Sequence, residues 1–196
     1  MNIRSKLKPL LALVLALLTA TIGCTPQWIN VAVQDLPVLT QMALNIATLV
    51  STLAAGKQAS TADVATIQNI SAQASRDLNL LQTLYTEYKA NPNSTTLQKI
   101  QNVTADVNQN LPALLQAAHI SNPTLSARVT AAVNLIVSTV NSVAALLPQT
   151  SAATSRKLNA QPLLQAKDLK KQWNLQVCSP TGNSAMDEAF AQNILR

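Results

Sequence analysis

The chain has 196 residues and a formal net charge of +6 at pH 7, with charged side chains at only 11% and aromatic side chains at 3% of the total. One histidine and two cysteines are too few for a multi-histidine metal centre or a disulfide framework. Three glycines leave no glycine-rich phosphate loop, and together with abundant alanine and leucine they favour helices over a β-sandwich or barrel.

The first 24 residues have the layout of an export signal. Three basic residues open it: Arg4, Lys6 and Lys8. An uncharged apolar run follows, shorter than the about 20 apolar residues that a membrane-spanning helix needs. The run ends in TIGC at positions 21–24, which resembles the lipobox of bacterial lipoproteins, although Thr21 stands where that family usually has leucine.

The resemblance to lipoproteins implies cleavage between Gly23 and Cys24 and acylation of Cys24. Several acyl chains on one residue hold a protein stably on a membrane, whereas a single chain does so only marginally. Thr25 follows Cys24 in place of aspartate, which in the same family implies the outer membrane, facing the periplasm, if the organism is Gram-negative. The alternatives are an ordinary signal peptide with a coincidental cysteine and an uncleaved anchor helix.

The sequence divides into four parts: a signal peptide over 1–23, a lipidated cysteine and tether over 24–33, a helical bundle over 34–148, and a linker with a basic helical tail over 149–196. About 170 residues remain after cleavage, which is enough for one domain with a sizeable core. The predicted fold class is all-α, with an antiparallel bundle of about four long helices and a short helical tail.

Four stretches of the bundle region repeat apolar residues at alternating steps of three and four, which predicts helices with one buried seam each. The first is expected over 35–55, with Asp35 as its N-cap. The second follows a capping signal from Ser60 to Asp63 and stops before Pro92.

The third predicted helix starts near Ser94 and contains Pro112, which should kink the helix or split it in two. The fourth, over 123–147, opens with a cap at Asn122 and a proline at its first position. It has the longest apolar seam in the chain: Val129, Val133, Ile136, Val140, Val143 and Leu147.

The helices over 35–55 and 123–147 also raise the question of membrane insertion, because both lack charge over about 18 residues. A polar stripe on the fourth helix favours an amphipathic bundle helix instead. This stripe consists of Thr130, Asn134, Ser138 and Asn141. We therefore expect a soluble bundle.

The excess positive charge lies at the two ends of the chain, since acidic and basic residues balance between 25 and 150. Within the tail, a basic helix is expected between Pro162 and Val177, and a short helix after Asn183. The basic helix carries a candidate contact surface for an anionic membrane or an acidic partner, formed by Lys167, Lys170, Lys171 and Trp173. A solvated helix face is the simplest structural explanation of the same charges.

Residues that carry catalytic chemistry are sparse. His119 and Cys178 lie in no recognisable catalytic motif, so we predict no enzyme, no metal site and no cofactor. With Cys24 acylated, Cys178 is the only free thiol, and we expect it to be buried rather than to form an intermolecular disulfide.

The predicted function is that of a membrane-tethered envelope lipoprotein that acts as a non-catalytic interaction or scaffold module. Its expected partners are the membrane, through the lipid anchor, and an unidentified envelope protein or a second copy of the chain, with no nucleic acid. One alternative is a membrane-active or oligomerising protein whose helices over 35–55 and 123–147 insert. Another is a carrier of an apolar ligand in the bundle interior.

Overall fold

The computed structural model describes residues 27–57, 59–117, 120–147 and 164–196. These residues form six helices and no strand. The predicted all-α helical bundle is therefore confirmed.

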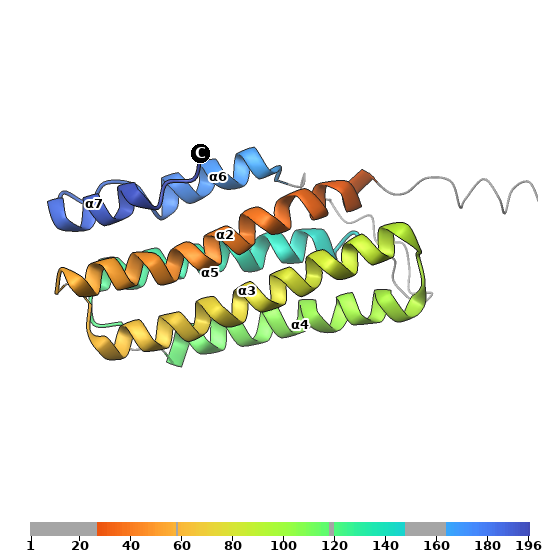
Figure 1. Cartoon of the computed structure of the whole chain (residues 1–196), viewed down its shortest axis with the longest axis horizontal. Coiled ribbons are helices and arrows are strands. Elements are labelled where there is room, and N and C mark those ends of the chain that lie inside the picture. The colour runs from red at the N-terminus through yellow and green to blue at the C-terminus, as the bar shows by residue number, and fades with distance from the viewer. Residues whose placement is uncertain (1–26, 58, 118–119, 148–163) are drawn as a thin grey trace, which may run out of the picture.

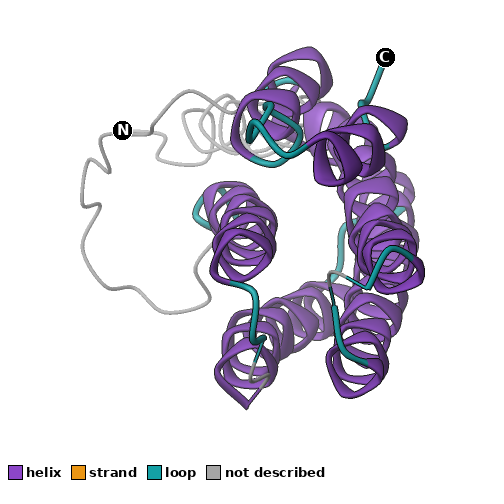
Figure 2. Cartoon of the chain, turned by 90° about the vertical axis from the view of Figure 1, so that its left-hand side faces the viewer, coloured by secondary structure: helices purple, strands orange, loops and turns teal. Residues whose placement is uncertain are grey.

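Four long helices form an antiparallel bundle (Figure 1). They are α2 (Gln27–Ala55), α3 (Thr61–Ala90), α4 (Ser94–Ala117) and α5 (Pro123–Ala144). Each helix contacts the next one along the chain, and α5 also contacts α2, so α2 and α4 lie diagonally opposite each other. Figure 2, which looks along the bundle, shows the helices running side by side around a common axis.

Two shorter helices lie along the outside of α2 and α5 (Figure 1). They are α6 (Ala166–Gln176) and α7 (Ser184–Gln192), and we call residues 164–196, which contain them, the C-terminal hairpin. Trp173 and Phe190 of this hairpin are fully buried, with 0% of each side chain exposed. The described part of the predicted tail therefore contributes side chains to the core of the bundle.

The seams predicted from apolar spacing face the interior. The whole seam predicted for the fourth helix is buried, and so are Tyr85 and Tyr88 of α3. The seam of α2 is buried as well: Leu36, Leu39, Ala43, Ile46, Val50 and Leu53. Trp28 meets the ring of Tyr85 edge-on, with 5.9 Å between ring centroids and 86° between ring planes. Asn134 and Asn141 of the polar stripe on α5 are exposed, as expected of an amphipathic bundle helix.

The predicted helix starts are confirmed where a side chain caps the first turn. Ser60 and Asp63 form a capping box at the start of α3, in which the Asp63 N–H donates to Ser60 Oγ at 3.1 Å. The side-chain oxygens of Asn122 and Asn183 cap α5 and α7, each accepting from the backbone N–H three residues further on.

Helix α2 begins at Gln27, so the predicted start at Asp35 is wrong, and residues 27–33, expected in the tether, are helical. The buried side chains of Ile29 and Ala32 extend the apolar seam toward the N-terminus of the helix. Tertiary packing of an apolar face stabilises a helix more than local capping preference does, and here packing keeps the residues before Asp35 helical.

Of the two outcomes predicted at Pro112, a kink or a split, the split is wrong, because α4 runs without a break from Ser94 to Ala117. A proline in a helix interior removes a backbone hydrogen bond and costs about 3 kcal/mol. Val107 and Leu111, on the seam just before Pro112, are fully buried. Their burial keeps this part of α4 helical despite the proline.

Replacing Trp173 by alanine should lower the free energy of unfolding by about 3–5 kcal/mol, because it removes a large side chain from the core. Urea denaturation followed by circular dichroism measures this change. Leu175, on the same helix, is 59% exposed, so Leu175→Ala should change stability by about 0.5 kcal/mol or less. Equal urea midpoints for the two variants would contradict the placement of α6 in the core.

Candidate functional site

Hydrogen bonds between α6 and residues 193–196 close the C-terminal hairpin. Trp173 Nε1 donates to the carbonyl of Asn193 at 2.9 Å. Asn174 pairs with Leu195 in both directions: its Nδ2 donates to the Leu195 carbonyl at 2.9 Å, and its Oδ1 accepts from the Leu195 N–H at 2.9 Å. The final residues therefore lie alongside α6 in a fixed register.

Arg128 of α5 holds the end of α6 against the bundle. Its guanidinium donates to the carbonyls of Gln176 at 2.6 Å and Ser179 at 3.1 Å. A positive charge is favourable there, because the C-terminal end of a helix carries partial negative charge. The same guanidinium lies 5.7 Å from the centroid of the Phe190 ring, so Arg128 contacts both parts of the hairpin.

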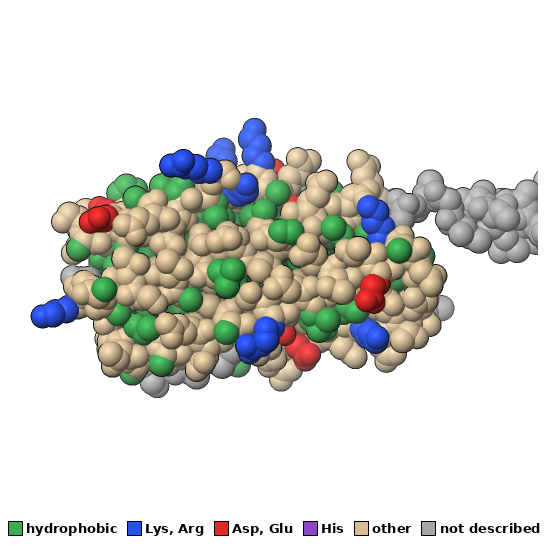
Figure 3. Space-filling model, in the orientation of Figure 1, with side chains coloured by type: hydrophobic (Ala, Val, Ile, Leu, Met, Phe, Trp, Pro, Cys, Tyr) green, Lys and Arg blue, Asp and Glu red, His purple; other side chains and the backbone are tan. Residues whose placement is uncertain are grey.

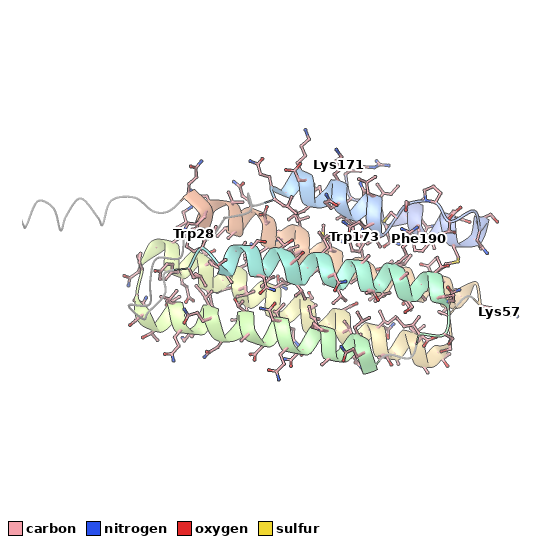
Figure 4. All side chains as sticks on the ribbon, turned by 180° about the vertical axis from the view of Figure 1, so that it is seen from behind. Trp28, Lys57, Lys171, Trp173 and Phe190 are labelled. Atoms are coloured by element: carbon pink, nitrogen blue, oxygen red, sulfur yellow. The ribbon has the colours of Figure 1, made fainter. Side chains whose placement is uncertain are left out.

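A surface groove of about 600 Å³ lies between α6 and the final residues beside it, and we call it the basic groove. Its wall is formed mainly by Lys167, Lys170, Lys171, Leu175, Leu195 and Arg196. Lys170 Nζ donates to an oxygen of the terminal carboxylate of Arg196 at 2.5 Å. Lys171 points away from the bundle (Figure 4). The groove is thus both positively charged and lined by leucine.

The structure brings together three of the four tail residues that the sequence predicted as a contact surface. The three lysines line the basic groove, but Trp173 points into the bundle and is fully buried (Figure 4). The inclusion of Trp173 in a surface contact is therefore wrong. Residues two apart do not face the same side of a helix, so Trp173 cannot accompany Lys171 at the surface.

Asp35 places a carboxyl group on the buried seam of α2. Its side chain is 1% exposed, and neither carboxyl oxygen has a donor at hydrogen-bonding geometry in the described part of the chain. Burial raises the pKa of Asp35 to about 7, because the ionised carboxylate loses its hydration in the core, and the backbone N–H of Ala166 opposes this only in part.

The N–H of Ala166 belongs to the first residue of α6, so Asp35 lies at the N-terminal end of that helix. Gln165, the N-cap of α6, makes no capping hydrogen bond with its side chain. The positive end of the α6 dipole therefore faces a carboxyl group from α2 instead of a cap of its own. Asp35 contacts the beginning of α6, as Arg128 contacts its end.

The surroundings of Cys178 and Asp187 fit a role in the fold: the first is a buried thiol and the second accepts local hydrogen bonds. The Cys178 thiol is buried, as predicted, and burial raises its pKa to about 11. Asp187 accepts from the backbone N–H of Thr181 at 2.6 Å and from its hydroxyl at 2.7 Å, and these bonds lower the pKa of Asp187. Among the described residues, no group of three or more His, Cys, Asp or Glu side chains could hold a metal ion.

A second groove, of about 540 Å³, lies between α4 and α5, and we call it the amide groove. Its polar side chains are uncharged: Gln101, Thr104, Asn108 and Asn141. Asn108 Nδ2 donates to Asn141 Oδ1 at 2.6 Å, which links the two helices. Thr104 Oγ1 and Asn108 Oδ1 are buried and have no hydrogen-bond partner within the described ranges.

Sequence reasoning missed the burial of Asp35 and the amide groove. Asp35 precedes Leu39 by four residues and Met42 by seven, and this spacing places all three on one helix face. Gln101 and Asn108 are likewise seven residues apart on α4. The spacing signals were present in the sequence, but the capping preference of aspartate pointed to a different role for Asp35.

The predicted lipidation site lies outside the described residues, as do Gly23 and His119. Lipidation of Cys24 therefore stays a prediction. Only Thr25 and Pro26 separate Cys24 from the first residue of α2.

Helices α2 and α5 are long and apolar enough to cross a membrane, judged by length and composition alone. Core helices of soluble proteins pass the same test, and both helices carry buried seams of the bundle. Their insertion into a membrane also stays a prediction.

No protein-family model, curated protein or solved structure matches this chain. The fold alone does not indicate a function, because helical bundles support many unrelated activities. The function has to be inferred from the leader, the two grooves and the buried polar groups of the chain itself.

Replacing Asp35 by asparagine should raise the free energy of unfolding by about 2 kcal/mol above pH 7, because no charge then has to be buried. Folding raises the pKa of this carboxyl from 3.8 to about 7 and therefore favours the protonated acid. The wild type should lose stability as the pH rises from about 4 to about 7, with no further loss from this group above that. Urea unfolding between pH 4 and pH 8 measures the difference.

Asp106→Asn is the matched control, because Asp106 on α4 is exposed. This variant should keep the pH dependence of the wild type. An Asp35→Asn protein that also keeps the wild-type pH dependence would contradict the raised pKa of Asp35.

Proposed function

We propose that this chain is a lipid-anchored protein of the bacterial cell envelope that acts as a non-catalytic interaction module. The observation that carries the proposal is the order of features along the sequence: an export-type leader ends in TIGC at positions 21–24, and the bundle helix α2 already includes Gln27, the first described residue. Acyl chains on Cys24 supply the membrane attachment. Thr25 after Cys24 supports the outer membrane, facing the periplasm, in a Gram-negative cell.

The short connection limits how far an anchored bundle stands from the membrane. Between Cys24 and Gln27 an extended chain reaches only about 10 Å. Trp28, in the first turn of α2, already contacts Tyr85 of α3, so the bundle is folded close to the attachment point. An anchored bundle of this kind offers the sides of its helices, rather than a long flexible arm, to other envelope components.

The amide groove supports a protein partner for this module. Thr104 Oγ1 and Asn108 Oδ1 are buried without a partner in the described residues, and such groups cost about 1–3 kcal/mol each. A partner can reach these two atoms only if the groove side chains shift, whereas the Asn141 amide is exposed at the groove and open to direct hydrogen bonding. The groove carries no charged side chain, so the partner it suits is an uncharged polar helix surface of an envelope protein or of a second copy of this chain.

The lipid anchor is tested by expressing the full chain in bacteria that are fed labelled palmitate. The wild type should incorporate the label, and Cys24→Ser should not, because the acyl chains attach to this cysteine. Cys178→Ser is the matched control: it removes the only other cysteine, which is buried, and it should keep the label. A label that persists in Cys24→Ser, or a wild type that never incorporates it, would count against the anchor.

The partner is tested with a photo-crosslinking residue at Ala105, which is exposed and lines the amide groove. Ala72, exposed on α3, is the matched control position. Irradiation of intact cells should give a discrete adduct from position 105 and not from position 72, and mass spectrometry of the adduct separates a second copy from another protein. Identical results at the two positions would contradict a partner at the amide groove.

A further inference from the structure

We propose that the basic groove docks the C-terminal hairpin on the surface of a bilayer that contains anionic phospholipid. Four positive side chains gather at the groove: Lys167, Lys170, Lys171 and Arg196. Figure 3 shows Lys and Arg side chains along the edge of the molecule that α6 occupies. Basic side chains close to an anionic leaflet gain binding from each charge, so this cluster suits a layer of phosphate headgroups.

Neighbouring acidic groups neutralise only part of the positive charge of the groove. Lys167 and Lys171 are exposed, and neither makes an ion pair or a hydrogen bond in the described part of the chain. Lys170 donates to an oxygen of Arg196, the last residue of the chain, so the terminal carboxylate offsets part of the charge of Lys170. Asp168 is the only acidic residue of α6. The groove therefore presents net positive charge to solvent.

Exposed apolar side chains flank these lysines. Lys167, Lys171 and Leu175 are four residues apart in turn, so they form one outward stripe of α6. Leu175 is 59% exposed, and Leu195 lines the same groove. Lysines beside leucines on an exposed face are the composition of helices that lie in the membrane interface.

The composition of the groove favours a lipid surface over an acidic protein. Its charges are mostly lysines on flexible stems, which bind as point charges, whereas arginines form fixed pairs with carboxylates. Protein interfaces usually centre on a buried aromatic or arginine anchor, and the aromatic residue of α6, Trp173, points into the bundle. Lipid headgroups form a mobile charged layer that needs no fixed geometry.

The inference rests on the proposed function, because a lipid on Cys24 is what brings the groove to the membrane. Helix α6 begins beside Asp35, about 12 Å along α2 from Gln27. A bundle that lies with its α6 side on the bilayer therefore keeps the groove near the attachment point.

The test uses the full chain, incorporated into vesicles of phosphatidylcholine alone or with about 30% phosphatidylglycerol, in which basic residues gain binding. A water-soluble acetylating reagent labels the lysines, and mass spectrometry measures the rate at each. In the anionic vesicles Lys167 and Lys171 should react at about one fifth of their rate in phosphatidylcholine, or at a still lower rate. Salt at about 0.5 M should restore their rates by screening.

Two lysines serve as internal controls. Lys57 is exposed at the end of the bundle opposite Trp28 (Figure 4), and Lys99 is exposed on α4, which α2 and α5 separate from α6. Both should react equally fast in the two kinds of vesicle. Equal rates at Lys167 and Lys171 in the two lipids, or equal slowing at all four lysines, would overturn the proposal. Slowing that appears only when an acidic protein is added would overturn it too.

Matched double variants test whether charge causes the docking. Lys167→Gln with Lys171→Gln should weaken docking by about 30-fold, because each of the two removed charges contributes a factor of about five. The slowing at Lys170 should disappear with it. Lys57→Gln with Lys99→Gln makes the same change of charge elsewhere and should leave Lys170 slowed. Slowing at Lys170 that persists in the first double variant, or that is lost in the second, would overturn the proposal.

The intact mass of the same purified protein reports acylation of Cys24 separately. An unacylated protein whose Lys167 and Lys171 are still slowed by anionic vesicles overturns the proposed anchor and supports the groove. An acylated protein whose Lys167 and Lys171 react equally fast in both lipids supports the proposed anchor and overturns the docking of the groove.

Discussion

The apolar surface of α2 has to be covered by other helices, and the rest of the structure depends on this constraint. Eleven of its 29 residues are buried, and they include adjacent pairs such as Met42 and Ala43 or Leu49 and Val50, which point in different directions around the helix. A four-helix bundle gives α2 only two neighbours, α3 and α5. The remaining apolar surface is covered by α6 and α7, which also contact α2. The C-terminal hairpin is therefore part of the fold, because without it α2 would expose apolar side chains to water.

The same coverage explains the buried polar groups around α6. Asp35 is enclosed where α6 begins, and Arg128 meets the carbonyls where α6 ends. Burial of Trp173 and Phe190 favours attachment of the hairpin, whereas burial of an ionised Asp35 opposes it. The attachment therefore responds to the protonation of one carboxyl group near neutral pH. On its outer side the attached hairpin presents the basic groove, so α6 packs on the bundle through Trp173 and faces solvent with its lysines.

Much of this fold could be predicted from the sequence, because long helices repeat a single apolar period and their ends carry capping residues such as Ser60, Asn122 and Asn183. The start of α2 and the continuity of α4 could not, since Asp35 and Pro112 are local stop signals that burial of neighbouring side chains overrides. The role of Trp173 could not be predicted either. In a helix of eleven residues with three lysines, an apolar face is too short to distinguish a core contact from a membrane contact. The lipid anchor remains a prediction from sequence, because its residues lie outside the described part.

One cooperative bundle that includes the C-terminal hairpin is the central claim of this account, and amide hydrogen exchange of the purified full chain at pH 7 tests it most directly. Mass spectrometry of peptides from α2 and from α6 gives the exchange rate of each helix. If the hairpin completes the core, the two helices should open with the same free energy, apart from their frayed ends. Exchange of α6 at the rate of an unfolded peptide, while α2 stays protected, would contradict the claim.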